Sequence, residues 1–412
     1  MVIAEINTLN VGSTGRIMME LADELRKEGD IVYTYSAKTF RRRTKNSFPA
    51  IKDHYYYGSL LDNFIHKVIG EITGFNGCFS IVTTLRLISR FKSQHIDILH
   101  LHNLHEFCIN LPLLFRYIKH NRIPVVWTLH DCWSITGHCP YFTMVNCSRW
   151  KTGCGNCHQK AVYPKCILDS THFMWKKKKK WFSNVENLTI VTPSNWLKSI
   201  IKESFLSSYR IEVINNGIDL DTFKPIPSTF RDKYMISKDK FLLLGVAFSW
   251  SEYKGLDVFA DLAARLPDSY QIVLVGISDI IKAKLPNNIL CIQKTNSQRE
   301  LAEIYSSADL FVNPTREDNF PTVNIESLAC GTPVLTFNTN GSPEIIDETC
   351  GKVVPYNDID KLEEQIIAIS NDMSFSREAC RKRAMQYIKS DKNKEYIHLL
   401  RQVYEMTRAF QN

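Results

Sequence analysis

The sequence predicts an α/β protein with two doubly wound parallel sheets, and three observations lead to this prediction. The chain has 412 residues, more than one ordinary domain contains. Strand-like and helix-like segments alternate through the first half, and the alternation begins again at Phe241. Residues 215–219, Asn-Asn-Gly-Ile-Asp, have the composition of a turn and separate the two halves. We therefore expect one domain over residues 1–217, a second over residues 218–390, and a C-terminal helix over residues 391–412 that packs back on the first.

The first half begins with a strand, Val2–Leu9, that leads through a glycine-containing turn into a helix. Apolar residues recur at helical spacing in this helix at Ile17, Leu21 and Leu25. Further strand-like segments follow at Ile31–Tyr35, Ile96–Leu101, Pro124–Leu129, Leu188–Pro193 and Ile211–Ile214. Such alternation is typical of a parallel sheet with helices on both faces.

The second half repeats this organisation. Strands are expected at Phe241–Ala247, Tyr270–Val275, Ile289–Ile292, Leu310–Asn313 and Thr332–Phe337. Helices are expected at Leu256–Leu266, Glu300–Ser306 and Ile325–Ala329. Two such halves predict a ligand-binding cleft at the carboxyl ends of the strands, where open parallel sheets bind their ligands.

Composition favours a globular protein of the cytoplasm. Hydrophobic residues make up 44% of the chain and charged residues 23%, values that suit sizeable cores. The sequence enters an apolar strand directly after Met1, without the basic segment of a secretory signal. Its apolar runs are strand-sized, far below the roughly 18 residues of a membrane-spanning helix.

The net charge of +8 is concentrated in the first half. Arg41–Arg43 form one basic cluster there. A second cluster consists of Trp175, Lys176, Lys177, Lys178, Lys179, Lys180 and Trp181. It is either a solvated helix face or a contact with an anionic membrane surface, since indole rings beside lysines suit the headgroup region. No nucleic-acid partner is expected, because no recognition motif accompanies the charge.

Half of the twelve cysteines lie in an insertion over residues 132–166. Cys139, Cys147 and the closely spaced pair Cys154 and Cys157 supply four thiolates, which suits a closed structural zinc site. With four protein ligands, such a zinc ion would hold the loop and take no part in catalysis. The alternative is a set of reduced cysteines packed as small apolar side chains.

A segment near the C-terminal third carries the strongest functional signal. Asp318 and Glu326 lie eight positions apart, after a buried strand and across a loop that turns into a helix. The first backbone N–H groups of such a helix bind anions, while two nearby acids can bind sugar hydroxyls. The segment therefore predicts a site for a nucleotide-activated sugar.

Three further positions could contribute to this site. Gly15 and Arg16 lie in the first strand-to-helix turn, which either receives a phosphate or is a tight turn without a ligand. His130 ends a strand and is either a hydrogen-bond donor to substrate or a structural histidine. His100, His102 and His105 carry the same ambiguity and are less favoured. Lys254 follows a strand and could neutralise a leaving diphosphate, although a Lys-Gly pair usually marks a surface loop.

These motifs resemble glycosyltransferase family 4, a family of retaining enzymes with the GT-B fold of two Rossmann-like domains. The Asp318-to-Glu326 segment looks like the E-x7-E element of that family. Residues 216–219 look like its N-G-[IV]-D motif, and residues 13–16 look like its amino-terminal glycine loop. The stretch from Thr128 to Cys157 is similar to a bacterial capsular and exopolysaccharide subgroup of the colanic acid galactosyltransferase type.

The resemblance implies a role for each position. Glu326 would bind the ribose, and Asp318 the sugar hydroxyls. Lys254 would stabilise the departing diphosphate without a catalytic metal. The remaining residues implied to contact the donor are Gly15, Arg16, His130, Asn319, Phe320 and Pro321. The implied reaction moves a hexose from a UDP- or GDP-linked donor to a saccharide acceptor, with the leaving phosphate helping to deprotonate the acceptor.

We expect a lipid-linked acceptor at the inner membrane face, in surface polysaccharide biosynthesis. A soluble small acceptor, or a non-catalytic role as an assembly scaffold, remains an alternative. The chain departs from the family pattern at two positions. Asp318 stands where the family has glutamate, and Phe248 stands where it usually has arginine.

Overall fold

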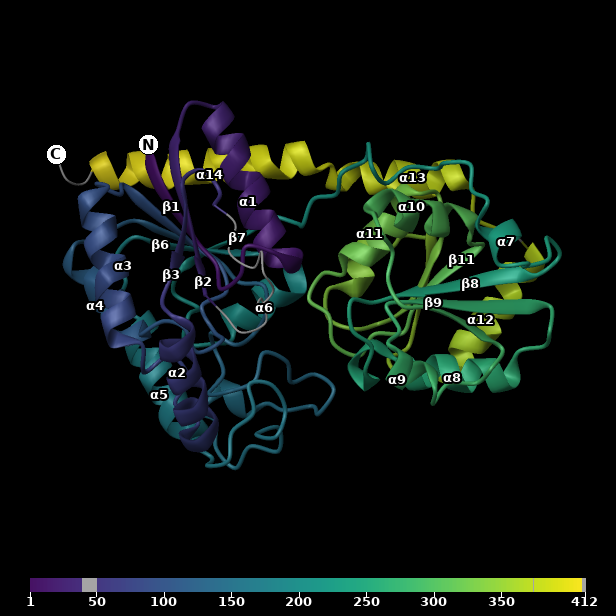
Figure 1. Cartoon of the computed structure of the whole chain (residues 1–412), viewed down its shortest axis with the longest axis horizontal. Helices are drawn as coiled ribbons and strands as arrows, with labels where there is room; N and C mark the ends of the chain where they lie inside the picture. The colour runs from purple at the N-terminus through teal and green to yellow at the C-terminus, as the bar shows by residue number, and fades with distance from the viewer. Residues whose placement is uncertain (39–49, 373, 410–412) are drawn as a thin grey trace. The chain divides into compact units, whose positions relative to one another are not determined.

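The computed structural model describes residues 1–38, 50–372 and 374–409, so Arg41–Arg43 lie outside the described residues. The chain divides into two compact units. Unit 1 comprises Met1–Ile214 and Asn393–Asn412, and unit 2 comprises Asn215–Lys392. Each unit is an α/β layer structure with its own parallel sheet and its own hydrophobic core (Figure 1).

Unit 1 is built on a seven-stranded parallel sheet with the order β3-β2-β1-β4-β5-β6-β7. The strands are β1 (Val2–Ile6), β2 (Ile31–Ala37), β3 (His54–Tyr57), β4 (Ile98–Leu101), β5 (Val125–Thr128), β6 (Leu188–Thr192) and β7 (Arg210–Val213). The central strands are buried along their whole length, as expected for a sheet covered on both faces.

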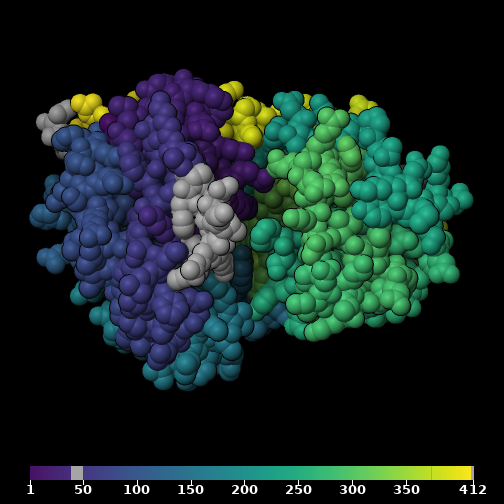
Figure 2. All heavy atoms as spheres, viewed as in Figure 1, coloured from purple at the N-terminus to yellow at the C-terminus, as the bar shows by residue number. Residues whose placement is uncertain are grey.

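Helices cover both faces of this sheet. They are α1 (Gly12–Lys27), α2 (Leu60–Thr73), α3 (Ile81–Ser93), α4 (Leu111–His120), α5 (Thr171–Phe182), α6 (Asn195–Lys202) and α14 (Lys389–Ala409). One core cluster joins the sheet to α1 and α14, through residues such as Ile3, Leu25 and Leu400. The other cluster packs the opposite face around Phe115 and Trp127. Helix α1 exposes polar residues such as Arg16, Asp23 and Lys27, and Figure 2 shows the N-terminal part of the chain, in purple, at the surface of unit 1.

Unit 2 repeats the design with a six-stranded parallel sheet in the order β10-β9-β8-β11-β12-β13. Its strands are β8 (Phe241–Val246), β9 (Tyr270–Val275), β10 (Ile289–Ile292), β11 (Leu310–Asn313), β12 (Val334–Phe337) and β13 (Gly351–Val354). Its helices are α7 (Phe230–Lys233), α8 (Leu256–Arg265), α9 (Asp279–Lys282), α10 (Gln298–Ser307), α11 (Thr322–Ala329), α12 (Ile359–Asp372) and α13 (Arg377–Ala384).

The predicted class, two doubly wound parallel sheets, is confirmed. The sequence pattern missed the edge strands β3 and β13, which are short and only partly apolar. Within the described residues, no helix is both long enough and apolar enough to cross a membrane.

Candidate functional site

The loop between β11 and α11, residues 314–321, forms the centre of the candidate site in unit 2. It follows the carboxyl end of β11, an inner strand of the sheet. The loop is almost entirely buried, but Asp318 is partly exposed, as are Thr322 and Val323 in the first turn of α11. The capping position of α11 is Pro321, which supplies no side-chain hydrogen bond to this turn. Solvent therefore reaches both the Asp318 side chain and the uncapped N-terminus of α11. The free backbone N–H groups of this helix start favour an anionic ligand.

A second loop, which joins β8 to α8, is fixed against the first. Arg316 forms a bidentate ion pair with Asp257, with both N–O distances 2.7 Å, and also donates to the Glu252 carbonyl oxygen. Hydrogen bonding to Arg316 lowers the pKa of the Asp257 carboxyl. Gly255, with a φ of +71°, allows close approach, because a Cβ there would overlap the Pro314 carbonyl oxygen. These contacts hold the two loops as one rigid surface.

Lys254 and Asp318 meet at the partly exposed edge of this surface. The Lys254 Nζ lies 2.5 Å from the Asp318 Oδ2, and the two side chains are 34% and 22% exposed. The structure thus brings together two residues that sequence reasoning assigned to the diphosphate and to the sugar. Because the pair is open to solvent, an incoming phosphate can compete with Asp318 for the ammonium group.

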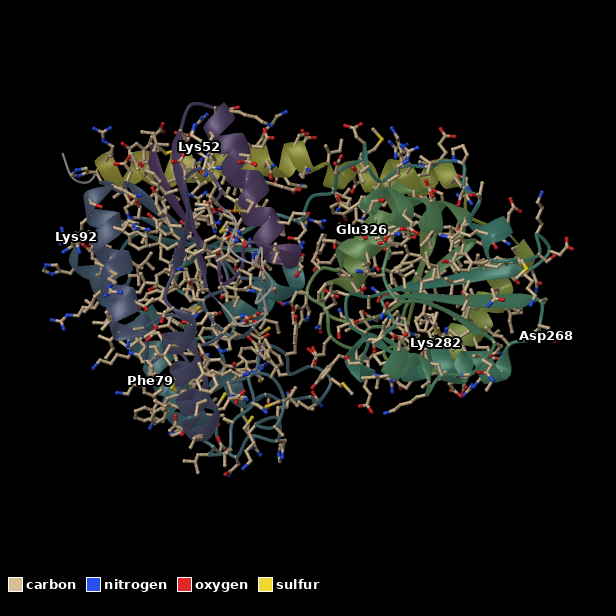
Figure 3. The ribbon with its side chains drawn as sticks, in the orientation of Figure 1. Lys52, Phe79, Lys92, Asp268, Lys282 and Glu326 are labelled. Atoms are coloured by element: carbon tan, nitrogen blue, oxygen red, sulfur yellow. The ribbon has the colours of Figure 1, made fainter. Side chains whose placement is uncertain are left out.

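Glu326 lies one helical turn further along α11 (Figure 3). It is 6% exposed, and the Tyr305 hydroxyl donates to its Oε2 over 3.2 Å. Burial, together with the negative charge of Glu326, raises the pKa of Tyr305, so the phenol keeps its proton and remains a donor. A carboxylate held in this way is positioned to accept hydrogen bonds from a ligand hydroxyl.

Buried amide contacts fix the start of α11. Asn313 donates to Asn324 over 2.7 Å, and Asn324 donates to the Ser342 hydroxyl over 3.1 Å. Asn319, Phe320 and Pro321 lie in the buried part of the loop, directly before the start of α11. Phe248, at the position where family 4 usually has arginine, is fully exposed.

Unit 1 contains a chain of buried polar groups on three adjacent strands. Glu5 on β1 lies opposite His100 on β4, and it accepts hydrogen bonds from His100 Nδ1 (2.9 Å) and His102 Nε2 (3.1 Å). His102 Nδ1 lies 3.0 Å from the Nε2 of His130, which follows β5. His100 Nε2 lies 2.8 Å from the Thr128 hydroxyl. The ligand atoms of Glu5, His100 and His102 also lie within 4.8 Å of one another.

The charges in this chain fix its proton positions. Burial alone would raise the pKa of Glu5, but His100 and His102 outweigh it and lower that pKa to about 2. Burial, reinforced by His100, lowers the pKa of His102 to about 4, and burial also lowers the pKa of His130. At neutral pH a charged Glu5 therefore faces a neutral His102, and His130 is neutral as well. His102 carries its proton on Nε2, and His130 donates from its own Nε2 to His102 Nδ1.

Gly15 and Arg16 lie in the first turn of α1. A Cβ at Gly15 would collide with the backbone of Leu9 and Asn10, so close packing of helix on loop already requires glycine there. Arg16 is exposed. The amino terminus of α1 and His130 both follow carboxyl ends of strands in the same parallel sheet, and so they lie along one edge of unit 1.

A family model described as "Glycosyltransferase Family 4" matches residues 14–222, about half of the chain, and one described as "Glycosyl transferases group 1" matches residues 228–387. The chain belongs to glycosyltransferase family 4. It is 26% identical to an Escherichia coli K12 protein named as a colanic acid biosynthesis glycosyl transferase, WcaC, over 64% of this chain and 65% of that protein.

A second relative is the Escherichia coli UDP-Gal:alpha-D-GlcNAc-diphosphoundecaprenol alpha-1,3-galactosyltransferase. It is 25% identical over 42% of this chain and 48% of its own length. The matches therefore span less than two thirds of both relatives. Sucrose-phosphate synthase from Thermosynechococcus elongatus has the same fold, with a TM-score of 0.69, 18% identity and coverage of 98% and 99% of the two chains.

HepE of Anabaena, solved with UDP-glucose, also has this fold, with a TM-score of 0.65, 14% identity and coverage of 98% and 100%. The expected GT-B architecture is thereby confirmed.

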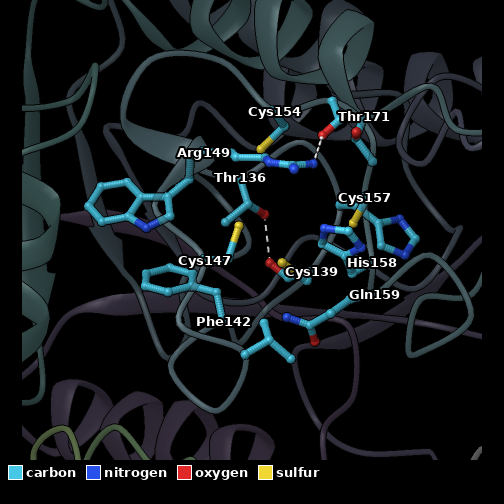
Figure 4. A pocket seen from close by; sticks show the side chains of 14 residues that line it. Thr136, Cys139, Phe142, Cys147, Arg149, Cys154, Cys157, His158, Gln159 and Thr171 are labelled. Atoms are coloured by element: carbon cyan, nitrogen blue, oxygen red, sulfur yellow. Dashed lines mark hydrogen bonds between the residues drawn. The ribbon is translucent and has the colours of Figure 1, made fainter.

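The cysteine-rich insertion of this family 4 protein forms a small pocket that is open to solvent. Cys139, Cys147, Cys154 and Cys157 all line it, and Figure 4 shows their side chains around its wall. Burial raises the pKa of Cys139, Cys154 and Cys157. Zinc ligands must lie within about 4.8 Å of one another, and within the described residues Glu5, His100 and His102 form the group that meets this distance. The four thiols line one pocket but are farther apart than zinc ligands.

The lysine run needs a correction, because α5 is not a uniformly exposed basic helix. Trp175 is 7% exposed and its indole N–H donates to the Trp150 carbonyl oxygen over 2.8 Å. Lys178 is completely buried, donates to the Trp133 carbonyl oxygen over 2.7 Å, and has its pKa lowered to about 7 by burial. These two residues cannot contact a membrane. Lys176, Lys179 and Lys180 are exposed, while Lys177 and Trp181 are partly exposed.

Sequence reasoning missed Glu5 and Arg316 as parts of the two sites. Arg316 stands beside the recognised acids, but its partner Asp257 lies 59 positions away. Glu5 was visible as a charged residue inside an otherwise apolar strand, which is a signal for a buried charge with partners. The alternating histidines of residues 100–105 were the second half of that signal.

Proposed function

We propose that this family 4 protein transfers a hexose from a UDP- or GDP-linked donor to a saccharide acceptor in surface polysaccharide biosynthesis, with retention of configuration. The observation that carries this proposal is the solvent-open pair of Lys254 and Asp318, beside the uncapped start of α11 and above the buried Glu326. The biosynthetic role is supported by WcaC, which is named for colanic acid. The donor class is supported by HepE, which was solved with UDP-glucose.

In the proposed reaction, the bond between the sugar C1 and the diphosphate oxygen breaks, and its electron pair stays with the diphosphate. The Lys254 ammonium and the first N–H groups of α11 stabilise the negative charge that develops there. The acceptor oxygen bonds to C1 on the same face, and its proton passes to the leaving phosphate. The proposal therefore includes no catalytic metal.

Asp318 has two successive tasks in this scheme. Before donor binding, its carboxylate holds Lys254 at the edge of the site. When the diphosphate takes over the ammonium group, the carboxylate is released to accept hydrogen bonds from sugar hydroxyls. Glu326 accepts from the ribose hydroxyls, because Tyr305 already orients it.

In unit 1 we assign His130 to the transferred sugar, and Arg16 with the amino terminus of α1, at Gly15, to the phosphates. Glu5 acts on His130 indirectly. Its carboxylate fixes the tautomer of His102, which in turn accepts the Nε2 proton of His130 and sets the orientation of that ring. Glu5 and His102 are thus positioning residues.

The proposed acceptor is a saccharide on a lipid diphosphate, presented to a cytoplasmic enzyme at the inner face of the membrane. The Escherichia coli galactosyltransferase relative is named for a diphosphoundecaprenol acceptor, which supports this choice.

We also propose that Cys139, Cys147, Cys154 and Cys157 bind one structural zinc ion after a small closure of their pocket. A backbone N–H at Gly137 already lies 3.2 Å from the Cys154 sulfur, as in a thiolate that accepts a hydrogen bond. The buried ammonium of Lys178, whose charge interacts favourably with Cys154 and Cys139, would offset the negative charge of four thiolates on one zinc. Elemental analysis of the purified protein should find about one zinc per chain. Protein that is purified without zinc, and in which every thiol can be labelled, would contradict this proposal.

The function is tested by offering purified protein a panel of UDP- and GDP-sugars together with an isolated lipid-linked saccharide. We expect release of the nucleoside diphosphate and a product extended by one hexose. Release without any donor preference, or no release from any donor, would contradict the proposal. Retention is read directly from the anomeric configuration of the new linkage.

A further inference from the structure

Helix α2 is amphipathic in the opposite sense to a normal surface helix. The side toward the protein buries Asn63, His66 and Gly70, which are small or polar. The large apolar residues Leu61, Phe64, Ile65, Val68 and Ile72 are 37–67% exposed. Their spacing places all five on one stripe of the helix. A stripe of this size on an otherwise well-packed unit marks an interaction surface.

The inverted orientation is fixed by specific contacts on the inner side. His66 Nδ1 lies 2.9 Å from the Ser80 hydroxyl, and the Gly77 N–H donates to His66 Nε2 over 3.2 Å. Gly70 has no room for a side chain, because a Cβ there would meet the Phe107 ring at 2.6 Å. Rotating α2 to bury its apolar stripe would break these contacts, so the exposure is built into the fold.

The apolar surface continues beyond α2. The Thr83 hydroxyl, at the start of α3, donates to Asp62 on α2 over 2.7 Å. The same turn of α3 exposes Ile81, Val82 and Leu85 by 50–59%. The two helices are therefore neighbours, and we call their exposed apolar residues together the α2–α3 face.

At the other end of α2, residues 167 and 168 extend this face. The backbone N–H of Leu168 donates to the Ile72 carbonyl oxygen over 3.0 Å. Ile167 and Leu168 are 67% and 56% exposed.

Positive charge surrounds this face. Helix α5 lies beside the end of α2 (Figure 1), where the ring of Phe173 is 5.2 Å from that of Phe75. The Lys177 ammonium lies 4.8 Å from the ring centre of the exposed Phe173. The neighbouring Lys176 is also exposed.

On the other side of the face, Arg86 and Arg90 line a pocket whose wall also includes Val82 of the face and Asp62. Apolar side chains ringed by lysines and arginines match the interface of an anionic bilayer, where acyl chains lie below phosphates.

We propose that the α2–α3 face inserts into the surface of an anionic lipid bilayer, with the flanking cations on the lipid phosphates. Charge complementarity favours this occupant over a second copy of the chain, because two such faces would bring their rings of cations together. The Trp175-to-Trp181 run thus contributes only its exposed lysines, and α2 supplies the apolar anchor. Only the reason for docking, a lipid-linked acceptor, rests on the proposed function.

The test is flotation of the purified full chain with vesicles of phosphatidylcholine mixed with phosphatidylglycerol, and with vesicles of phosphatidylcholine alone. We expect binding to the anionic vesicles. The triple variant Phe64→Gln, Ile65→Gln, Val68→Gln keeps good helix formers at exposed positions, so α2 should persist. It should bind at least about tenfold more weakly. The matched control Met235→Gln, Ile280→Gln removes two exposed apolar residues of unit 2 and should bind like wild type.

Light scattering and nucleotide binding complete the test. A wild-type monomer is expected in solution. A dimer that the triple variant dissociates would show that a second copy covers the face, and equal vesicle binding by the triple variant would show that the face is idle; either result overturns the inference. Binding of UDP or GDP should be the same in wild type and triple variant, so loss of vesicle binding is separable from failure of the proposed function.

Discussion

The two candidate sites use carboxylates in opposite ways. In unit 2, Asp318 forms an ion pair at a surface edge where both partners remain partly exposed. In unit 1, Glu5 is completely buried and shared between His100 on the neighbouring strand β4 and His102 just after it. A ligand can replace one partner of an exposed ion pair at little cost in free energy. Separating a buried pair costs several kcal/mol of folding free energy. The difference fits the proposed roles, in which a ligand phosphate opens an exchangeable ion pair in unit 2 while the buried groups of unit 1 keep a fixed arrangement.

The largest effect is expected from Lys254→Ala. Without the ammonium group, the leaving diphosphate loses its main counter-charge, and turnover should fall by about 10²–10³-fold. Stability should hardly change, because the lysine is partly exposed. Initial-rate kinetics with the preferred donor provide the measurement, and Lys282→Ala, an exposed lysine on α9, is the control. Equal losses in both variants would remove Lys254 from the mechanism.

A smaller but distinct effect is expected from Glu5→Gln, and it concerns stability. The folded pKa of Glu5 is about 2 against an ordinary value of 4.5, so its contribution is present above pH 4.5 and is lost as pH falls toward 2. The variant should lose on the order of 2 kcal/mol of unfolding free energy at neutral pH. Its stability should also depend less on pH below 4.5.

Denaturant unfolding at neutral and acidic pH measures this effect, with the exposed Glu348→Gln as control. His102, with its pKa lowered from 6.5 to about 4, adds a second loss in both proteins. As pH falls from 6.5 toward 4, the unfolded chain takes up this proton and the folded chain does not. A Glu5 variant as stable as wild type would show that the buried chain is not structural.

The smallest stability effect is expected from Asp318→Asn, which isolates the contrast between the two carboxylates. Loss of a partly exposed ion pair should change the unfolding free energy by less than about 1 kcal/mol. Turnover should nevertheless fall by about tenfold, because the amide cannot accept as strongly from sugar hydroxyls. Asp318→Glu restores the charge and should recover most of the activity. Unfolding and kinetic measurements on both Asp318 variants test this prediction. A large loss of stability in Asp318→Asn would show that Asp318, like Glu5, is a structural group.

The fold class could be predicted from the sequence because apolar strand segments recur along the chain and are separated by turn residues. The segments Tyr270–Val275, Ile289–Ile292 and Leu310–Asn313 were placed at their observed bounds, and the other predicted strands differed by one to three residues at their ends. The edge strand β3 was missed because its residues, His-Tyr-Tyr-Tyr, lack an apolar run.

The site was only partly predictable, because long-range pairs leave no local mark. Lys254 and Asp318 were each chosen for separate reasons, yet their direct contact spans 64 positions. The lysine run of α5 was interpreted from local composition, which could not show that Lys178 points inward to Trp133. The apolar residues of α2 recur at helical spacing within residues 61–72, but only the exposed fractions of their side chains in the structure show that they face outward.

The central claim is that the loop from Arg316 to Glu326 binds a nucleotide-linked donor, and calorimetric titration with UDP and GDP tests it most directly. We expect wild type to bind one of the two nucleotides, and Glu326→Gln to bind it about tenfold or more weakly, since a charged acceptor is lost. The control Glu303→Gln, on α10 beside Arg299, should bind like wild type. Absence of binding to either nucleotide, or equal binding by wild type and Glu326→Gln, would contradict the account.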